Sequence, residues 1–217
     1  MLSEARREQI LAIAQSLVRI PSLAGEEGAV IEQTAHWMRE LGYDDVQVDA
    51  CGNLIGTLHG GQGATVIYDS HVDTVAAGDL SAWRYDPFGG AVADGKLYGR
   101  GACDMKGSLA ASLAALAYAK QDGVLRGTAL VSASVGEEVI EGLAFSHVLA
   151  AHKPDLVVIC EATELRLVTA GRGRAEITIT THGKSAHAST PQLGVNALKQ
   201  MAKLVSALDS LTPPEDA

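Results

Sequence analysis

Apolar residues recur at helical spacing through the first forty positions of the chain. Residues 3–20 are predicted to form a helix with Ser3 as its N-cap and Pro21 beyond its end. A second helix is predicted from Glu27 to Leu41, because Gly42 is a typical helix stop. The residues that share the apolar face of the first helix are Ile10, Ala14, Leu17 and Val18.

From residue 45 onwards, short apolar runs alternate with longer helical patterns. The predicted strands are 45–50, 53–58, 64–70, 127–135 and 155–161, and the predicted helices between them are 106–123 and 142–152. This alternation predicts an α/β fold, with a mostly parallel sheet and helices on both of its faces. Ligands of such sheets bind at the carboxyl ends of the strands, so the functional residues are expected there.

The pattern changes near residue 172. Over residues 173–183, apolar and polar side chains alternate as in a strand with one face exposed to water, and a helix is predicted from about Asn196. The apolar face of that helix carries Leu198, Met201, Val205 and Leu208. The sequence therefore predicts a core domain over residues 1–172 and the beginning of a second domain over residues 173–217.

Composition excludes several classes of protein. The 217 residues are 47% hydrophobic, enough for an ordinary buried core, and the net charge is −9 with no block of Lys or Arg. A partner with a phosphate backbone is not expected of such a chain, so we predict no nucleic-acid binding.

Membrane insertion and export are not predicted either. The first residues mix charges into an amphipathic pattern, unlike a signal peptide. The longest apolar stretch lies between Lys106 and Lys120, shorter than the ~20 residues that span a bilayer. Three cysteines without CxxC spacing are typical of a reducing compartment. A cytoplasmic protein is expected.

Acidic residues gather where the predicted strands end. His71 and Asp73, two apart after the strand 64–70, are expected to project together. Asp104 lies in a glycine-flanked turn before a helix, and the remaining residues at strand ends are Glu137, Glu138 and Glu161. One imidazole and five carboxylates are therefore expected along one edge of the sheet.

Carboxylates packed closely repel one another unless a cation neutralises them. Nitrogen and oxygen ligands without thiolate suit zinc, with cobalt or manganese as substitutes, and this many acids favour two metals bridged by a carboxylate. Of the adjacent Glu137 and Glu138, one can bind metal while the other takes a proton from activated water. Asp73 can orient His71 or help to hold the base. Hydrolysis is the chemistry that this set predicts.

Each signal has a simpler interpretation when taken alone. A His-x-Asp pair is often a surface or capping feature, a Gly-Glu-Glu sequence is usually a solvated turn, and Asp104 is a natural N-cap. A serine hydrolase that uses Ser70 and His71 is disfavoured, because the GxSxG nucleophile turn is missing. The joint occurrence of the acids at strand ends favours the metal site.

The ordered motifs "SHVDTV", "GRGACDMKG", "GEE", "CEAT" and "GRGRAEITITTHGKSAHAS" resemble the dinuclear zinc family of acetylornithine deacetylase, succinyl-diaminopimelate desuccinylase and glutamate carboxypeptidase. The resemblance covers nearly the whole chain and is nearest to the selenium-metabolism-linked hydrolase branch. It implies a hydrolase of amide bonds in N-acyl amino acids or small peptides.

The resemblance also implies roles for single residues. His71 and Glu161 would bind one zinc, Glu138 the other, and Asp104 would bridge the two. Glu137 would be the general base, with Asp73 beside His71.

The second domain of the family is a lid that forms a homodimer. Its histidine reaches the partner subunit's active site to polarise the scissile carbonyl, and His187 matches it. The other histidines, which have no such context, are His36, His59, His147, His152 and His182.

Family members are considerably longer, and a histidine near their C-terminus completes the second metal site. This chain has no match for that ligand, so we expect an N-terminal fragment with a weakened second site and an unpaired strand edge. The competing hypothesis is a catalytically inactive remnant that serves association. Metal content and hydrolysis of N-acetyl amino acids would distinguish the two.

Overall fold

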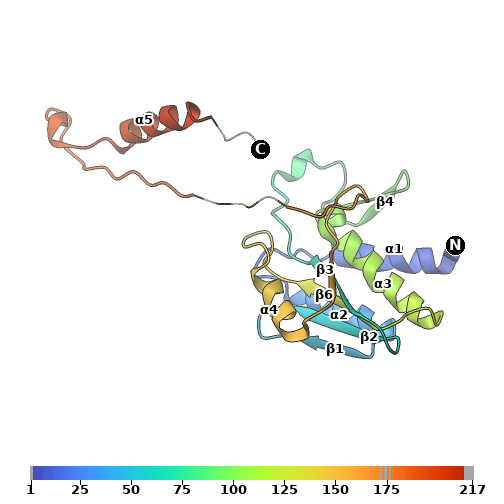
Figure 1. Cartoon of the computed structure of the whole chain (residues 1–217). Helices are drawn as coiled ribbons and strands as arrows, with labels where there is room; N and C mark the ends of the chain where they lie inside the picture. Colours follow the sequence, from blue (N-terminus) through green and yellow to red (C-terminus); the bar gives the residue numbers. More distant parts are fainter. Residues whose placement is uncertain (1, 172, 174, 176, 213–217) are drawn as a thin grey trace. The chain divides into compact units, whose positions relative to one another are not determined.

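The computed structural model describes residues 2–171, 173, 175 and 177–212. A five-stranded sheet forms the core of the part that precedes residue 168 (Figure 1). Its strands lie in the order β1 (Asp45–Val48), β2 (Leu54–His59), β6 (Thr128–Ser134), β3 (Thr65–His71) and β7 (Leu156–Ile159). β3 pairs in parallel with both β6 and β7, whereas β2 pairs antiparallel with β1 and β6. The α/β fold is confirmed, and the predicted parallel pairing holds for β6, β3 and β7.

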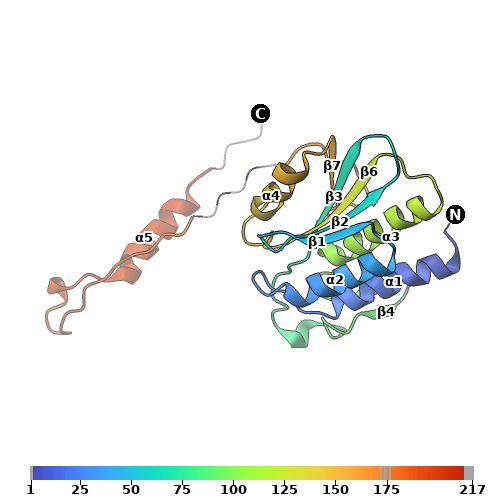
Figure 2. The same cartoon turned by 90° about the horizontal axis from the view of Figure 1, so that it is seen from below.

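Helices cover both faces of this sheet. α1 (Glu4–Val18), α2 (Gly28–Glu40) and α3 (Gly107–Gln121) pack on one face and α4 (Leu143–His152) on the other (Figure 2). Side chains alternate along β2, so they point to the two faces in turn. Leu54 and Leu58 belong to the larger core cluster, which lies under α1, α2 and α3, and Ile55 packs with Phe145 of α4.

Local sequence sets the ends of several elements. The Ser3 side chain accepts a hydrogen bond from the Arg6 N–H at 3.3 Å, so Ser3 caps α1 as predicted. α3 is followed by Gly123 in the left-handed region, with φ of 68°, as the sequence also predicts.

A hairpin of β4 (Ala91–Ala93) and β5 (Lys96–Tyr98) was not among the predicted elements. Its turn is Asp94–Gly95, with φ of 53° and 71°. Asp-Gly is a preferred sequence of such two-residue turns and could have indicated the hairpin. The flanking strands have only three residues each, too few to show a pattern of alternation.

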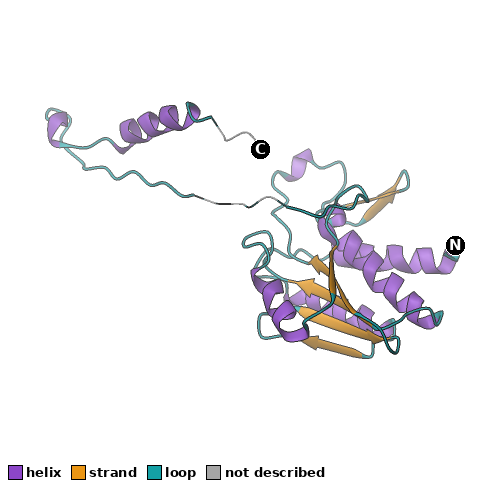
Figure 3. Ribbon diagram, viewed as in Figure 1, coloured by secondary structure: helices purple, strands orange, loops and turns teal. Residues whose placement is uncertain are grey.

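The chain divides into two compact units, Met1–Leu167 and Val168–Ala217. In the second unit, Asn196 accepts from the Lys199 N–H at 3.0 Å and caps α5 (Ala197–Asp209), which confirms the predicted helix. The strand expected over residues 173–183 is not formed in the described residues of that segment, which Figure 3 draws as loop. Residues 174 and 176 lie outside the described residues.

The difference has a physical reason. A strand is stable only when a neighbouring strand pairs with its backbone N–H and C=O groups. In the described part of the second unit, the backbone pairing beside this segment is a single bridge between Lys184 and Val195. The roles predicted for the two domains stay predictions.

Among the described residues, no helix combines the length and the apolar content that crossing a bilayer requires.

Candidate metal centre

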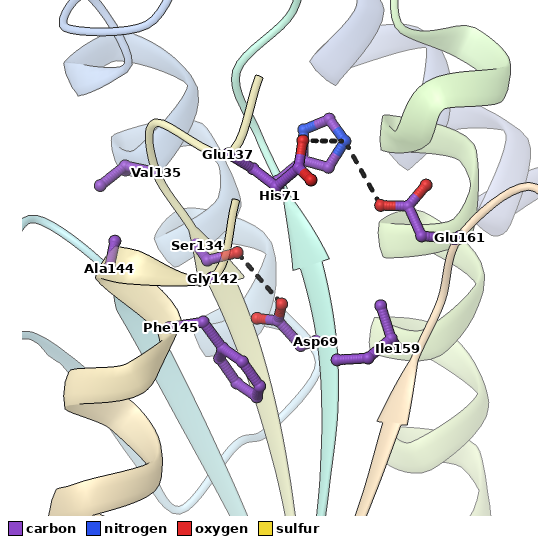
Figure 4. A pocket seen from close by; sticks show the side chains of 10 residues that line it. All are labelled: Asp69, His71, Ser134, Val135, Glu137, Gly142, Ala144, Phe145, Ile159 and Glu161. Atoms are coloured by element: carbon purple, nitrogen blue, oxygen red, sulfur yellow. Dashed lines mark hydrogen bonds and ion pairs between the residues drawn. The ribbon is translucent and has the colours of Figure 1, made fainter. Parts of the chain in front are cut away.

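Parallel pairing of β6, β3 and β7 places the ends of these strands on one edge of the sheet. His71 is the last residue of β3, Glu137 and Glu138 follow β6, and Glu161 follows β7. Figure 4 shows His71, Glu137 and Glu161 directed toward one another at this edge. The structure thus brings together residues that lie up to 90 positions apart, from His71 to Glu161.

The Nε2 atom of His71 is the centre of this group. It lies 3.0 Å from Asp104 Oδ1, which comes from the turn Ala102–Lys106 before α3. It is also 3.8 Å from Glu137 Oε2 and 3.7 Å from Glu161 Oε1. The imidazole itself is buried, with 2% of its surface exposed.

Two sets of ligand atoms are close enough to hold a metal ion. His71, Asp104 and Glu138 form one set, and His71, Glu137 and Glu161 form the other, with the atoms of each set within 4.8 Å of one another. One imidazole nitrogen with several carboxylate oxygens suits zinc, cobalt or manganese. The residues present therefore fit the expected metal, with four carboxylates around one imidazole.

Asp73 is fully buried and holds both the histidine and the acidic turn. His71 Nδ1 lies 2.9 Å from the Asp73 backbone carbonyl and 3.5 Å from Asp73 Oδ1. A carbonyl only accepts, so Nδ1 carries the hydrogen and a neutral ring presents a lone pair at Nε2, toward the acids. The two oxygens of the Asp73 carboxylate accept from the backbone N–H groups of Glu137 and Glu138 at 3.1 and 3.0 Å.

Negative charge around the imidazole favours its protonated form. Burial opposes the charge, but the hydrogen bond and charge of Asp73, together with Glu137 and Glu161, raise the pKa of His71 to about 10. A divalent cation would occupy the same field and replace that proton.

Burial and neighbouring negative charges raise the pKa values of two of the acids. Burial raises the pKa of Glu137, and its acidic neighbours add to this effect while His71 opposes it. Burial and the nearby Asp104 likewise raise the pKa of Glu161 against the influence of His71. A carboxylate with a raised pKa is a better proton acceptor than an ordinary one.

A cavity of about 160 Å³ lies beside the centre on the α4 side of the sheet. Asp69, two residues before His71 on β3, lines it together with Ser134, Phe145 and Ile159 (Figure 4). Burial raises the pKa of Asp69 to about 6, and its Oδ1 has no hydrogen-bond partner among the described residues. Sequence reasoning missed Asp69, although its spacing of two from His71 places both on one face.

His187 belongs to the second unit and is exposed. Its Nδ1 accepts from the Ser189 backbone N–H at 3.2 Å and lies 2.8 Å from Ser189 Oγ. The hydrogen of a neutral ring is therefore on Nε2, which makes that atom a donor. Ser70 is fully buried and alternates with His71 along β3, so it is not placed as a serine nucleophile.

Comparison with known proteins identifies a family. The sequence profile of "Peptidase family M20/M25/M40" matches residues 67–216. The chain is 33% identical over 202 residues to the Escherichia coli (strain K12) protein named "Uncharacterized protein YgeY", covering 91% of this chain and 50% of that protein. It is 30% identical over 222 residues to succinyl-diaminopimelate desuccinylase of Rhodospirillum centenum, covering 92% and 56%.

A solved structure has the same fold. The M20 family metallo-carboxypeptidase Sso-CP2 from Sulfolobus solfataricus superposes with a TM-score of 0.70 at 20% identity, covering 94% of this chain and 49% of that one. The chain thus spans about half the length of the curated relatives it matches.

Proposed function

Since the chain belongs to the peptidase family M20/M25/M40, we propose that it is a metal-dependent hydrolase of amide bonds in N-acyl amino acids or small peptides. The names of two similar proteins, a desuccinylase and a metallo-carboxypeptidase, support this substrate class. The observation that carries the proposal is the convergence of four carboxylates on His71, at the edge of the sheet where three parallel strands end.

Four residues would hold the metal. His71, Asp104, Glu138 and Glu161 are proposed as its ligands, and two Zn²⁺ ions are the proposed complement, with Co²⁺ or Mn²⁺ as substitutes. When bound, such ions supply Lewis acidity toward water and toward the substrate carbonyl. Asp73 would keep His71 in the tautomer whose Nε2 faces the acids.

Glu137 is proposed as the general base. Its carboxylate reaches the centre from the same turn as Glu138, and its raised pKa favours uptake of a proton. The proton taken up at the Glu137 carboxylate would then pass to the leaving amine.

His187 is proposed to stabilise the oxyanion in a homodimer. The Ser189 N–H fixes Nδ1 as an acceptor, so Nε2–H is free to donate to a carbonyl oxygen of a substrate. The dimer, the identity of the metal and the cytoplasmic location remain predictions from the sequence.

Substitution of Glu137 by Gln tests the proposal. Turnover of N-acetyl and N-succinyl amino acids should fall roughly 10²–10⁴-fold, because the base is lost, whereas bound zinc should change little. Metal content by mass spectrometry and initial rates by amine release measure the two effects. Glu8→Gln, an exposed glutamate of α1, is the matched control and should keep both.

Two results would contradict the proposal. Glu137→Gln with the turnover of the unaltered chain would remove Glu137 as the base. A folded chain loaded with zinc that hydrolyses none of these amides would favour the inactive remnant instead.

A further inference from the structure

Four consecutive backbone N–H groups in the turn after β6 are held by buried side chains from elsewhere in the chain. The Val135 N–H donates to Asn53 Oδ1 at 3.1 Å and the Gly136 N–H donates to Glu27 Oε1 at 3.0 Å. The next two, of Glu137 and Glu138, donate to the Asp73 carboxylate. Turn amides more commonly face water or a local carbonyl, so this set requires an explanation.

The three acceptors are hidden from solvent and come from separate segments. Asn53 and Asp73 are 0% exposed and Glu27 is 7% exposed. Glu27 precedes α2, Asn53 precedes β2 and Asp73 follows β3. Burying two carboxylates and an amide is unfavourable unless they are bonded, and here each of the three accepts a hydrogen bond from the same turn.

Asn53 also fixes the turn to its neighbours. Its Nδ2 donates to the Ala144 carbonyl at 2.9 Å and to Asp49 Oδ2 at 2.8 Å. Because the Ala144 carbonyl only accepts and the Val135 N–H only donates, the orientation of the Asn53 amide is determined by its partners. Asn53 therefore connects the turn to the first turn of α4.

The turn needs such support because of its glycine. Gly136 has φ of 68°, in the left-handed region, and a Cβ placed there would meet nothing within 4 Å. Glycine adopts many backbone conformations at little cost, so the hydrogen bond from the Gly136 N–H to Glu27 helps to select one of them. The residue next to it is Glu137.

We propose that Glu27 and Asn53 are positioning residues of the metal centre. Together with Asp73 they fix the backbone of the 135–138 turn, so that the Glu137 and Glu138 carboxylates reach His71 without reorganisation. Neither Glu27 nor Asn53 touches metal or substrate in this account. The expected effect on metal binding rests on the proposed function, whereas the hydrogen bonds do not depend on it.

Matched variants at Glu27 separate this role from general packing. Glu27→Met keeps the length of the side chain and removes the acceptor, Glu27→Gln keeps an acceptor, and Glu27→Asp keeps the charge but shortens the reach. The exposed neighbour Glu26, changed to Met, is the control. At Asn53, Leu removes both functions of the amide, and Asp keeps the acceptor for Val135.

Co²⁺ titration followed by visible absorption measures the effect. Glu27→Met and Asn53→Leu should weaken metal binding roughly 10–100-fold and change the absorption bands, because the positions of the ligands relax. Glu27→Gln should restore both, Glu27→Asp should be intermediate, and Glu26→Met should match the unaltered chain. Unchanged affinity and spectrum in folded Glu27→Met and Asn53→Leu would overturn the proposal.

Amide hydrogen exchange in the metal-free protein provides the second readout. The Gly136 amide should exchange at least about tenfold faster in Glu27→Met and at its original rate in Glu27→Gln. If Glu27→Met does not fold, Glu27→Asp takes its place. Protection of Gly136 that is the same in all variants would overturn the inference, while failure of the unaltered chain to bind metal would instead overturn the proposed function.

Discussion

His71 combines two properties that normally oppose each other. It is buried, which disfavours a charge, yet the surrounding acids raise its pKa to about 10. In the metal-free protein at neutral pH, the imidazole therefore carries a second proton, on Nε2, in addition to the one on Nδ1. The Nε2 proton must leave before that atom can bind a metal.

Binding of the metal ion that His71 ligates should accordingly release about one proton near neutral pH. The sign follows from the direction of the shift: below a pKa of about 10 the free site is protonated, so metal affinity rises as pH rises toward that value. Calorimetric titration in buffers of different ionisation heat measures the released protons.

The exposed His36, changed to Ala, should leave this proton count unchanged. Metal binding with no proton release would show that the imidazole is neutral in the free protein, contrary to the account.

The sequence predicted the acidic residues of the centre and the supporting Asp73, but not Glu27 and Asn53. His71, Glu137 and Glu161 could be predicted because strand ends meet at one edge of an α/β sheet. Glu27 and Asn53 act through backbone amides far away in the sequence, and no residue spacing encodes such a contact. Only folding brings these side chains to the turn.

At the level of elements, a buried side chain of α3 can be replaced to test how much the larger core cluster contributes to stability. Leu113 of α3 is fully buried in the cluster that joins α1, α2 and the sheet. Its replacement by Ala should lower the free energy of unfolding by about 2–5 kcal/mol, because the side chain leaves a cavity.

Leu198 of α5 is the matched control, since 80% of it is exposed and its replacement by Ala should cost less than about 0.5 kcal/mol. Denaturant unfolding with and without metal measures both. An equal effect of the two replacements would contradict the packing described here.

Long elements were predictable from the sequence, and their pairing was predictable only in part. Periodicity located α1, α2, α3, α4 and α5 and the five strands of the sheet. It did not specify that β2 runs antiparallel to β6, since alternation of side chains is the same in either direction. The strand expected at 173–183 illustrates a second limit of periodicity. An alternating pattern does not produce a strand when no neighbouring strand pairs with it.

For the whole molecule, family membership establishes the fold and the class of protein. The activity stays a proposal, because the relatives that the chain matches are about twice as long. The first unit contains the five proposed metal and base residues, and the second contains His187. We therefore expect the first unit alone to gather one imidazole and four carboxylates that bind metal.

Equilibrium dialysis of the chain against Zn²⁺ measures this binding, with His71→Ala and His36→Ala dialysed alongside. We expect at least one tightly bound ion per chain, retained in His36→Ala and lost in His71→Ala, because His71 belongs to both sets of ligand residues. Zinc binding by His71→Ala equal to that of the unaltered chain would contradict it.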